Sequence, residues 1–282
     1  MILIADSGAT KTEWLLTGSD GTAQTIYTVG LNPYFLNTEA IAMVLCDQLL
    51  PATNGADIQT VYYYGTGCNS PASCAIVATA IRVVWPSVQT VEVESDMLGA
   101  ARAACGNEPG IVCILGTGSN ACRYDGRQIT SPSHSLGFWL GDEGSGGYLG
   151  KSLVVDFLHD KLPPDLQQRF VGQYPLSRVT VLENAYQKPA PNRYFASFTP
   201  FLSENMAHPY VQNVVKQAFL TFLDLYVKRF PESVEWPVHF IGSVAFYFQD
   251  LLRAAAAERQ VRLGRMLQAP MEHLARYHGE NK

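Results

Sequence analysis

Short apolar runs that stop at small, turn-forming residues alternate along the chain with segments of helical spacing. In the first third of the chain this pattern predicts strands within 1–18 and at 25–29, 61–64 and 88–93, and helices at 38–50, 70–84 and 97–105. Thr38 is the predicted N-cap of the first helix. Three strands followed by alternating helices and strands are typical of an α/β sheet.

The same order begins again after a glycine- and proline-containing linker at 106–110. Strands are predicted at 111–115, 121–124 and 238–241, and helices at 147–159, at 246–258 and near 270–277. The segment 160–230 has mostly helical spacing, interrupted by prolines. The chain therefore reads as an α/β protein with two similar halves, although their side chains are not alike.

Composition narrows the function classes. Apolar residues make up 47% of the 282 residues and charged residues 16%, enough apolar material for packed cores. The net charge of −5 and the absence of a long basic run argue against nucleic-acid binding. The chain lacks a run of the roughly 20 apolar residues that cross a membrane. It also begins without a basic leader, and none of its six cysteines forms a C-x-x-C pair, so we expect a cytoplasmic protein with reduced thiols.

A glycine- and threonine-containing loop occurs twice, each time between two apolar runs. The first occupies 6–12 and the second 116–120. Glycine lets the backbone approach an oxygen-rich ligand, and the acid Asp6 at the end of a strand can hold a hydrated Mg²⁺. The alternative is an ordinary tight turn, but two such loops between strands make coincidence a weak explanation. Together they point to a nucleotide triphosphate.

Three further segments carry candidate chemistry. Asp96 follows a predicted strand and is either a general base or simply a helix N-cap. The glycine-rich segment 141–147 holds Asp142 and Glu143, and is either a ligand loop or a flexible cap of the next helix. Trp139 precedes it, and composition favours a core position over a platform for a sugar ring. Gly242 opens a strand–helix turn whose backbone can lie under a planar base, although a plain turn explains it equally well.

The ordered set of segments 6–12, 64–67, 115–120, 141–145 and 241–245, with Asp96, resembles the ATPases that share the actin, sugar-kinase and heat-shock-chaperone fold. Within that superfamily the loop of Asn32 and the segment 137–145 resemble the N-acetylglucosamine kinase branch, which is related to the acyl-CoA reductase-activating ATPases. The resemblance spans nearly the whole chain. It implies two ribonuclease-H-like α/β domains with a nucleotide and sugar cleft between them. Their predicted bounds are 1–107, joined by the C-terminal helix 268–282, and 108–267.

The resemblance also implies roles for individual residues. Asp96 would be the catalytic base, and Asp6 would hold Mg²⁺ through water. The ATP phosphates would lie against Gly8, Ala9, Thr10, Lys11, Thr12, Gly116, Thr117, Gly118 and Ser119. Adenine would lie against Gly242, Ser243 and Val244. The sugar would contact Asn32, Asp96, Gly118, Ser119, Trp139 and Asp142.

The expected reaction is ATP- and Mg²⁺-dependent phosphorylation of an amino sugar, with N-acetylglucosamine and its 6-phosphate as the leading pair. Kinases of glucosamine or N-acetylmuramate remain alternatives, because acetamido contacts cannot be read from a motif. An ATPase that activates a partner reductase or dehydratase through an iron–sulfur cluster between two subunits is a third alternative, suggested by Cys105 before Gly106. A sugar sensor without catalysis is disfavoured by the presence of Asp96. Dimers are common among relatives, so a homodimer is a further expectation.

Overall fold

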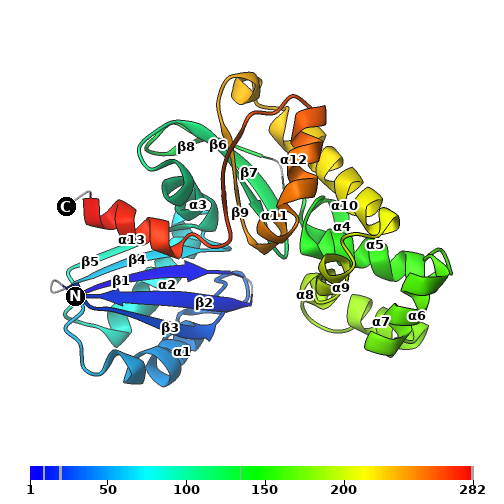
Figure 1. Cartoon of the computed structure of the whole chain (residues 1–282). Coiled ribbons are helices and arrows are strands. Elements are labelled where there is room, and N and C mark those ends of the chain that lie inside the picture. Colours follow the sequence, from blue (N-terminus) through cyan, green and yellow to red (C-terminus); the bar gives the residue numbers. More distant parts are fainter. Residues whose placement is uncertain (9, 19–20, 134, 281–282) are drawn as a thin grey trace. The chain divides into compact units, whose positions relative to one another are not determined.

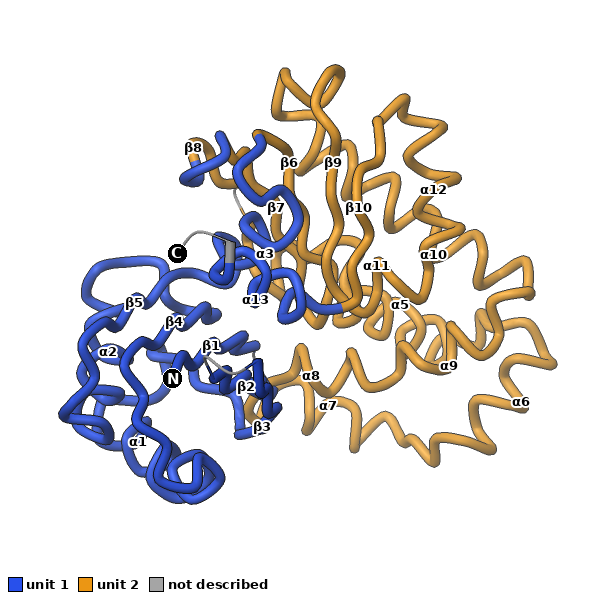
Figure 2. The backbone as a smooth tube through the Cα atoms, turned by 60° about the vertical axis from the view of Figure 1, so that its left-hand side comes forward, with its two compact units in different colours: residues 1–108, 125–129, 269–282 blue, residues 109–124, 130–268 orange. Residues whose placement is uncertain are grey.

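The computed structural model describes residues 1–8, 10–18, 21–133 and 135–280. It divides into two units, one of residues 1–108, 125–129 and 269–282 and the other of residues 109–124 and 130–268 (Figure 2). Each unit holds a mixed five-stranded sheet with helices, as Figure 1 shows, so the predicted α/β fold with two similar halves is confirmed.

The sheet of unit 1 has the strand order β3-β2-β1-β4-β5. The central strand pairs antiparallel with β2 and parallel with β4, which pairs parallel with β5. The elements of unit 1 are β1 (Ile2–Ser7), β2 (Lys11–Thr17), β3 (Ala23–Val29), α1 (Thr38–Val44), the π-helical turn Leu45–Leu49, the 3-10 turn Pro51–Thr53, β4 (Thr60–Gly65), α2 (Pro71–Val84), β5 (Thr90–Ser95), α3 (Asp96–Cys105) and α13 (Met271–Glu280).

Local sequence explains where the helices of unit 1 begin. Ser70 caps α2 in a reciprocal pair with Ser73, and Pro71 occupies the first helical turn, where its missing N–H costs nothing. The N-cap of α1 is Asn37, whose side chain accepts a hydrogen bond from the Ala40 N–H, and not Thr38 as predicted. Asparagine and threonine both act as N-caps, so the sequence alone does not decide between the adjacent positions 37 and 38. α13, far away in sequence, packs against α3 and β1.

The sheet of unit 2 has the order β10-β9-β6-β7-β8, with β6 antiparallel to β7 and parallel to β9. Its elements are β6 (Gly110–Leu115), β7 (Ser119–Tyr124), β8 (Ile129–Pro132, whose first residue groups with unit 1), α4 (Gly137–Leu140), α5 (Gly146–Leu158), α6 (Pro164–Gln173), α7 (Arg178–Tyr186), α8 (Pro191–Ala196), α9 (Thr199–Glu204), α10 (Pro209–Phe222), the π-helical turn Leu223–Val227, the 3-10 turn Pro231–Val234, β9 (Val238–Ile241), α11 (Ser243–Tyr247), α12 (Gln249–Glu258) and β10 (Leu263–Leu267).

Sequence periodicity missed β8 and β10. β10 contains Gly264, and its pairing with β9 is irregular between Leu263 and Met266. The His239 ring lies where a Cβ on residue 264 would sit, so glycine is what allows this strand to approach β9. Such a strand is defined by its neighbour and has no pattern of its own to detect.

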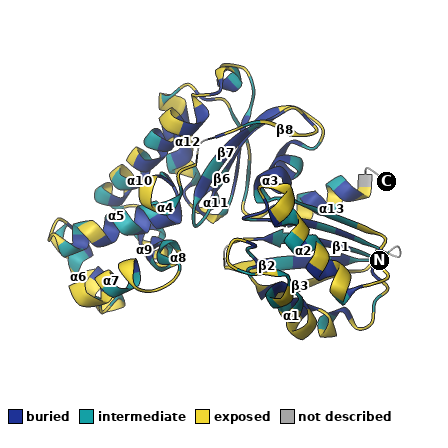
Figure 3. Cartoon of the chain, turned by 180° about the vertical axis from the view of Figure 1, so that it is seen from behind, coloured by how far each residue is buried: buried dark blue, intermediate teal, exposed yellow. Residues whose placement is uncertain are grey.

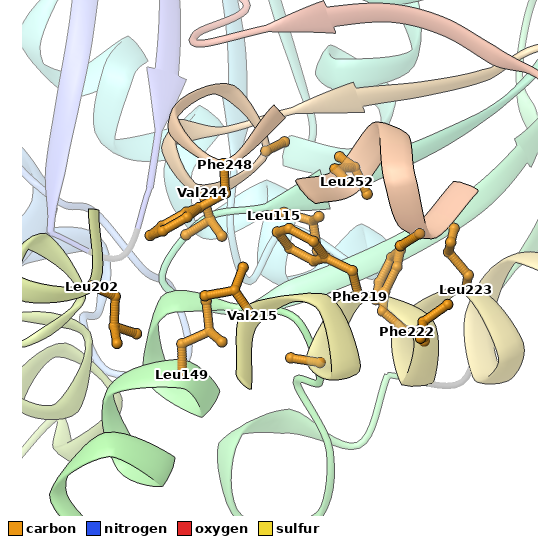
Figure 4. Close-up of a cluster of buried hydrophobic side chains, with 14 of the residues drawn as sticks. Leu115, Leu149, Leu202, Val215, Phe219, Phe222, Leu223, Val244, Phe248 and Leu252 are labelled. Carbon is orange, nitrogen blue, oxygen red and sulfur yellow. The ribbon is translucent and has the colours of Figure 1, made fainter. Parts of the chain in front are cut away.

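Each unit has its own hydrophobic core, and Figure 3 shows buried residues on the strands and on the inward faces of the helices. In unit 1, Leu3, Trp14 and Tyr63 are fully buried between the sheet and α1 and α2. In unit 2, Phe219 and Phe222 of α10 belong to the same cluster as Leu115, the last residue of β6 (Figure 4). The cores therefore hold the strand ends from which both loops emerge.

Candidate active site

One edge of the unit 1 sheet gathers the predicted acids. Strands β1, β4 and β5 are parallel and in register, with Ser7 opposite Gly65 and Gly65 opposite Ser95. Their carboxyl ends therefore reach the same edge, where α/β proteins commonly bind ligands. Asp6 lies near the end of β1, and Asp96 follows directly after β5.

Asp96 is the first residue of α3 but not its N-cap. Ser95 takes that role, because its side chain accepts from the Leu98 N–H. Asp96 Oδ1 accepts from the Met97 N–H at 2.8 Å, and the side chain of Thr66 donates a further hydrogen bond to the carboxyl group. The capping alternative is thus removed, and the carboxyl group is oriented by two donors.

Burial raises the pKa of both acids. The pKa of Asp6 rises to about 7, mainly by burial and further through the charges of Asp96 and Glu13, while Lys11 opposes the rise. Burial likewise raises the pKa of Asp96, although the donors Thr66 and Met97 oppose it. A carboxyl group whose pKa is shifted toward neutrality is a better proton acceptor than an ordinary aspartate, so these two groups suit acid–base chemistry.

Asn32 is brought to the same edge by the loop after β3. The Tyr63 hydroxyl donates to the Leu31 carbonyl at 2.9 Å, and Asn32 Oδ1 accepts from the Tyr34 N–H at 2.9 Å. Gly67 has φ +86°, and a Cβ at this position would lie 2.3 Å from Asn32 Oδ1. Glycine at 67 therefore permits Asn32 to lie against the turn that also carries Thr66.

The first glycine loop presents only part of its predicted set to solvent. Gly8, Thr10 and Lys11 are exposed, with the Lys11 ammonium 4.7 Å from the centroid of the Tyr27 ring. Thr12 is buried, and its hydroxyl bonds Ser7 Oγ at 2.7 Å and donates to the Val29 carbonyl at 3.1 Å. The Thr12 hydroxyl thus stabilises the hairpin. Ala9 lies outside the described residues.

The second glycine loop is held by the start of α5. The Gly146 N–H donates to the Gly116 carbonyl at 2.8 Å, and the Gly147 N–H donates to the Thr117 carbonyl at 3.0 Å. Ser119, at the end of the loop, is 4% exposed, and its hydroxyl has no partner among the described residues. Buried hydroxyls normally have a partner, so a ligand oxygen at this loop would satisfy Ser119.

Asp142 faces that loop from the glycine-rich segment. It is buried, it has φ +59°, and its Oδ1 accepts from the Ser119 N–H at 3.3 Å. A Cβ on Gly118 would lie 3.0 Å from Asp142 Oδ2, so glycine leaves room for the carboxyl group. Burial raises the pKa of Asp142, and the neighbouring Glu143 raises it further. The positive φ and the burial of its carboxyl group make Asp142 a candidate functional position.

Glu143, which had no predicted role, is anchored differently. The Tyr226 hydroxyl donates to Glu143 Oε2 at 2.7 Å. A Cβ on Gly141 would lie 2.9 Å from the same hydroxyl. The sequence signalled Glu143 only as the neighbour of Asp142, because Tyr226 is more than 80 residues away. Tyr226 therefore holds the segment in which Asp142 lies.

The expectation of a core position for Trp139 is wrong. Its side chain is 50% exposed and stacks on Tyr186 of α7, with ring centroids 5.5 Å apart and 7° between the planes. Trp139 lies on α4, three residues before Asp142. An exposed indole close in sequence to a buried acid matches the platform alternative better than the core one.

The turn predicted to bind adenine lies beside the second glycine loop. Gly242 has φ +122°, and a Cβ there would lie 2.3 Å from the Leu115 carbonyl oxygen. Val244 is part of the core of unit 2, whereas Ser243 is exposed. Unit 2 thus brings together the second loop, Asp142 and the turn at Gly242, while unit 1 brings together Asp6, Asp96 and Asn32.

No group of three or more histidine, cysteine, aspartate or glutamate side chains among the described residues is arranged to hold a metal ion. Among those same residues, no helix has the length and apolar character to cross a membrane.

Comparisons with known proteins match this chain to sugar kinases. No family model and no curated protein matches the sequence. Among solved structures, the "Putative N-acetylglucosamine Kinase" of Porphyromonas gingivalis is 41% identical over 100% of this chain and 99% of its own, with a TM-score of 0.96. The protein of the same description from Chromobacterium violaceum is 19% identical over 98% of each chain, with a TM-score of 0.74.

A more distant similarity extends to the fold of the ROK-family glucokinase of Streptomyces griseus, solved with glucose and AMPPNP. It is 14% identical over 99% of this chain and 98% of its own, with a TM-score of 0.63. This match supports the fold alone, whereas 41% identity over the full length identifies the family. The chain belongs to the N-acetylglucosamine kinase branch of the sugar kinases with the actin-like fold.

Proposed function

We propose that the chain transfers the γ-phosphoryl group of ATP to the 6-hydroxyl of N-acetylglucosamine, with Asp96 as general base. The observation that carries the proposal is the environment of Asp96. It lies at the carboxyl end of parallel strands, two donors orient it, and burial raises its pKa. A sugar hydroxyl is a weak nucleophile, and a carboxylate held against it takes its proton as the new P–O bond forms.

The phosphates of ATP lie, in this proposal, against the two glycine loops. Gly8, Thr10 and Lys11 are exposed on the first loop, where Lys11 offers a positive charge, and the second loop offers the unpaired hydroxyl of Ser119. Donors of this kind offset the charge that spreads over the transferring phosphoryl group. The base of ATP would lie on the backbone of the turn at Gly242.

Mg²⁺ fits this chain only as a partly hydrated ion. The described residues hold no cluster of three ligating side chains, but Mg²⁺ characteristically keeps several waters and binds one or two carboxylates together with substrate phosphates. Asp6 would hold the ion through water, and the ion would lower the raised pKa of that carboxyl group. When bound, Mg²⁺ supplies charge neutralisation on the phosphates.

The sugar is recognised, in this proposal, by the residues that the resemblance assigns to it. These are Asn32, Asp96, Gly118, Ser119, Trp139 and Asp142. Asp142 accepts hydrogen bonds from sugar hydroxyls, while Trp139 covers the apolar face of the ring. The 41% identity to a kinase described for N-acetylglucosamine favours that sugar over the other amino sugars.

A coupled assay of ADP release tests the proposal. The panel holds N-acetylglucosamine, glucosamine, N-acetylmuramate, N-acetylmannosamine and glucose, each with Mg-ATP. We expect strong turnover with N-acetylglucosamine and at least tenfold lower kcat/KM with glucosamine and glucose. If another sugar of the panel were preferred, the proposed substrate would be wrong but the proposed phosphoryl transfer would stand. If the protein bound ATP but turned over none of these sugars, the reductase-activating ATPase would be favoured. A brown colour after anaerobic purification would then indicate its iron–sulfur cluster.

A further inference from the structure

We propose that Tyr186 is a positioning residue for the sugar, because its ring holds the indole of Trp139 in the orientation that stacks on the apolar face of the pyranose. The inference rests on the proposed function, and it assigns a role within the segment 160–230, where the sequence pointed to no functional residue. It begins from the unusual exposure of both rings.

Neither ring is held in place by burial. Trp139 is 50% exposed and Tyr186 is 74% exposed, yet their planes lie within 7° of each other. The neighbours of Trp139 on either side of α4 do not enclose it, since Leu136 is 60% and Leu140 is 75% exposed. The parallel stack with Tyr186 is therefore the main contact that restricts the indole on this surface.

The rest of α4 is fixed by different contacts. The Phe138 ring stacks on Phe195 of α8, with centroids 5.6 Å apart. The Lys151 ammonium lies 4.8 Å from the centroid of the Phe138 ring and donates to the Phe138 carbonyl at 3.3 Å. These contacts fix the backbone of α4. The Trp139 and Phe138 rings meet edge-on, with centroids 4.8 Å apart. Orientation of the indole thus depends on Tyr186.

α7 is built to deliver Tyr186 to this place. Its N-cap is Ser177, and its buried side chains are Val181 and Ala185, which anchor the helix to the core of unit 2. Tyr186 is the last residue of the helix and points out of that core. A large aromatic ring left exposed at a helix end gains little by burial, so its stack on Trp139 is its evident structural purpose.

A sugar platform benefits from such a support. A ring that is already ordered loses less conformational entropy when the ligand binds, which strengthens binding without any new contact to the sugar. Trp139 is three residues from Asp142, so the orientation of the indole is also set relative to an acid proposed to bind sugar hydroxyls. Tyr186 would act on the sugar and not on ATP.

The test compares three variants of α7 in the full chain: Tyr186→Ala, Tyr186→Phe and, as a matched control, Val179→Ala, which removes an exposed apolar side chain from the same helix. We expect Tyr186→Ala to raise KM for the sugar about three- to tenfold, the range for one lost aromatic contact, with kcat and KM for ATP within twofold of wild type. Tyr186→Phe keeps the ring and should match wild type, as should Val179→Ala.

A second readout needs no turnover. Sugar added to the wild-type protein should change its tryptophan fluorescence, Trp139→Phe should abolish the change, and Tyr186→Ala should shift its midpoint to higher sugar concentration. Normal KM and midpoint in Tyr186→Ala would overturn the inference while leaving the proposed function intact. A lower KM would also overturn it, since Tyr186 would then cover the sugar face of the indole. Absence of both turnover and a fluorescence change in the wild type would overturn the two proposals together.

Discussion

The two glycine loops lie in hairpins of the same kind, but their polar groups are bonded differently. β1 and β6 are each flanked by one antiparallel and one parallel strand, and each leads into a glycine-containing turn. In unit 1 the hydroxyls of Ser7 and Thr12 bond each other inside the protein, and the carboxyl group of Asp6 in the same strand has a raised pKa. In unit 2 the loop backbone is hydrogen-bonded to the start of α5, and the buried hydroxyl of Ser119 has no partner among the described residues.

Because of this difference, the polar groups of the two units suit different kinds of chemistry. Unit 1 carries acids of raised pKa, Asp6 and Asp96, which suit proton transfer and a metal ion. Unit 2 carries the buried hydroxyl of Ser119, which has no partner among the described residues, and Asp142 with its positive φ, which suit binding and orientation. Substitution of the unit 1 acid Asp96 should therefore affect turnover most, and substitution of Asp142 in unit 2 should affect binding most.

The largest effect is expected for Asp96→Asn. The variant loses the proposed base but keeps the size of the side chain, so kcat should fall by about 10³-fold or more while calorimetric affinity for N-acetylglucosamine changes little. Glu94→Gln removes the same charge from β5 two residues earlier and should retain most of the activity. Near-normal kcat in Asp96→Asn would remove this residue from catalysis.

Asp142→Ala should weaken sugar binding, whereas Asp96→Asn should lower turnover. It removes a buried acceptor from unit 2, and we expect KM for the sugar to rise about 10- to 100-fold with KM for ATP within twofold. Steady-state kinetics with each substrate varied in turn measures both. A selective loss of ATP affinity would reassign the loop to the nucleotide.

Gly67→Ala tests whether Asn32 contacts the sugar. The added methyl group would lie 2.3 Å from Asn32 Oδ1, so Asn32 must move, and KM for the sugar should rise about tenfold. Gly106→Ala is the matched control, because residue 106 also has positive φ, at +62°, but an added Cβ meets nothing within 4 Å. Both variants place a Cβ on a residue with positive φ, which strains the backbone, and only Gly67→Ala displaces Asn32.

If the kinetic effects of the two glycine variants were equal, strain alone would explain them and Asn32 would lose its proposed role. Melting temperatures of the two variants, measured alongside the kinetics, show whether the strain is in fact comparable.

The smallest effect is expected on stability, from Asp6→Asn. The pKa of Asp6 is raised from 3.8 in the unfolded chain to about 7 in the fold, so ionisation of this group destabilises the fold progressively as pH rises from about 4 to 7. Asparagine removes that penalty. Without Mg²⁺ or ATP, the variant should melt at least about 2 °C above wild type at pH 8, and the gain should vanish near pH 4. A variant less stable than wild type at pH 8 would contradict the raised pKa.

Much of the fold could be predicted from the sequence because its pattern is local. The strand at Val238–Ile241 was predicted at its observed bounds, and the helix predicted at 70–84 is observed as α2, Pro71–Val84. β10 and Tyr186 could not be predicted. Their roles depend on His239 and Trp139, partners distant in the chain, and no local spacing records such contacts.

The candidate site was predictable in part for the same reason. A glycine at a strand end can signal close approach of two backbones, and at Gly242 an added Cβ would lie 2.3 Å from the Leu115 carbonyl oxygen. At Gly116 an added Cβ would meet nothing within 4 Å, so that glycine does not mark a close approach. The exposure of Trp139 was not predictable, because composition assigns tryptophan to cores, whereas a four-residue helix cannot bury one.

The most direct test of the central claim is the identity of the product, determined by phosphorus–proton correlation NMR after wild-type protein has acted on N-acetylglucosamine and Mg-ATP. The account predicts a phosphate ester whose phosphorus couples to the two protons on C6 of the sugar, formed in equal amount with ADP. Phosphorus coupled to the anomeric proton, or free phosphate with no sugar ester, would contradict it.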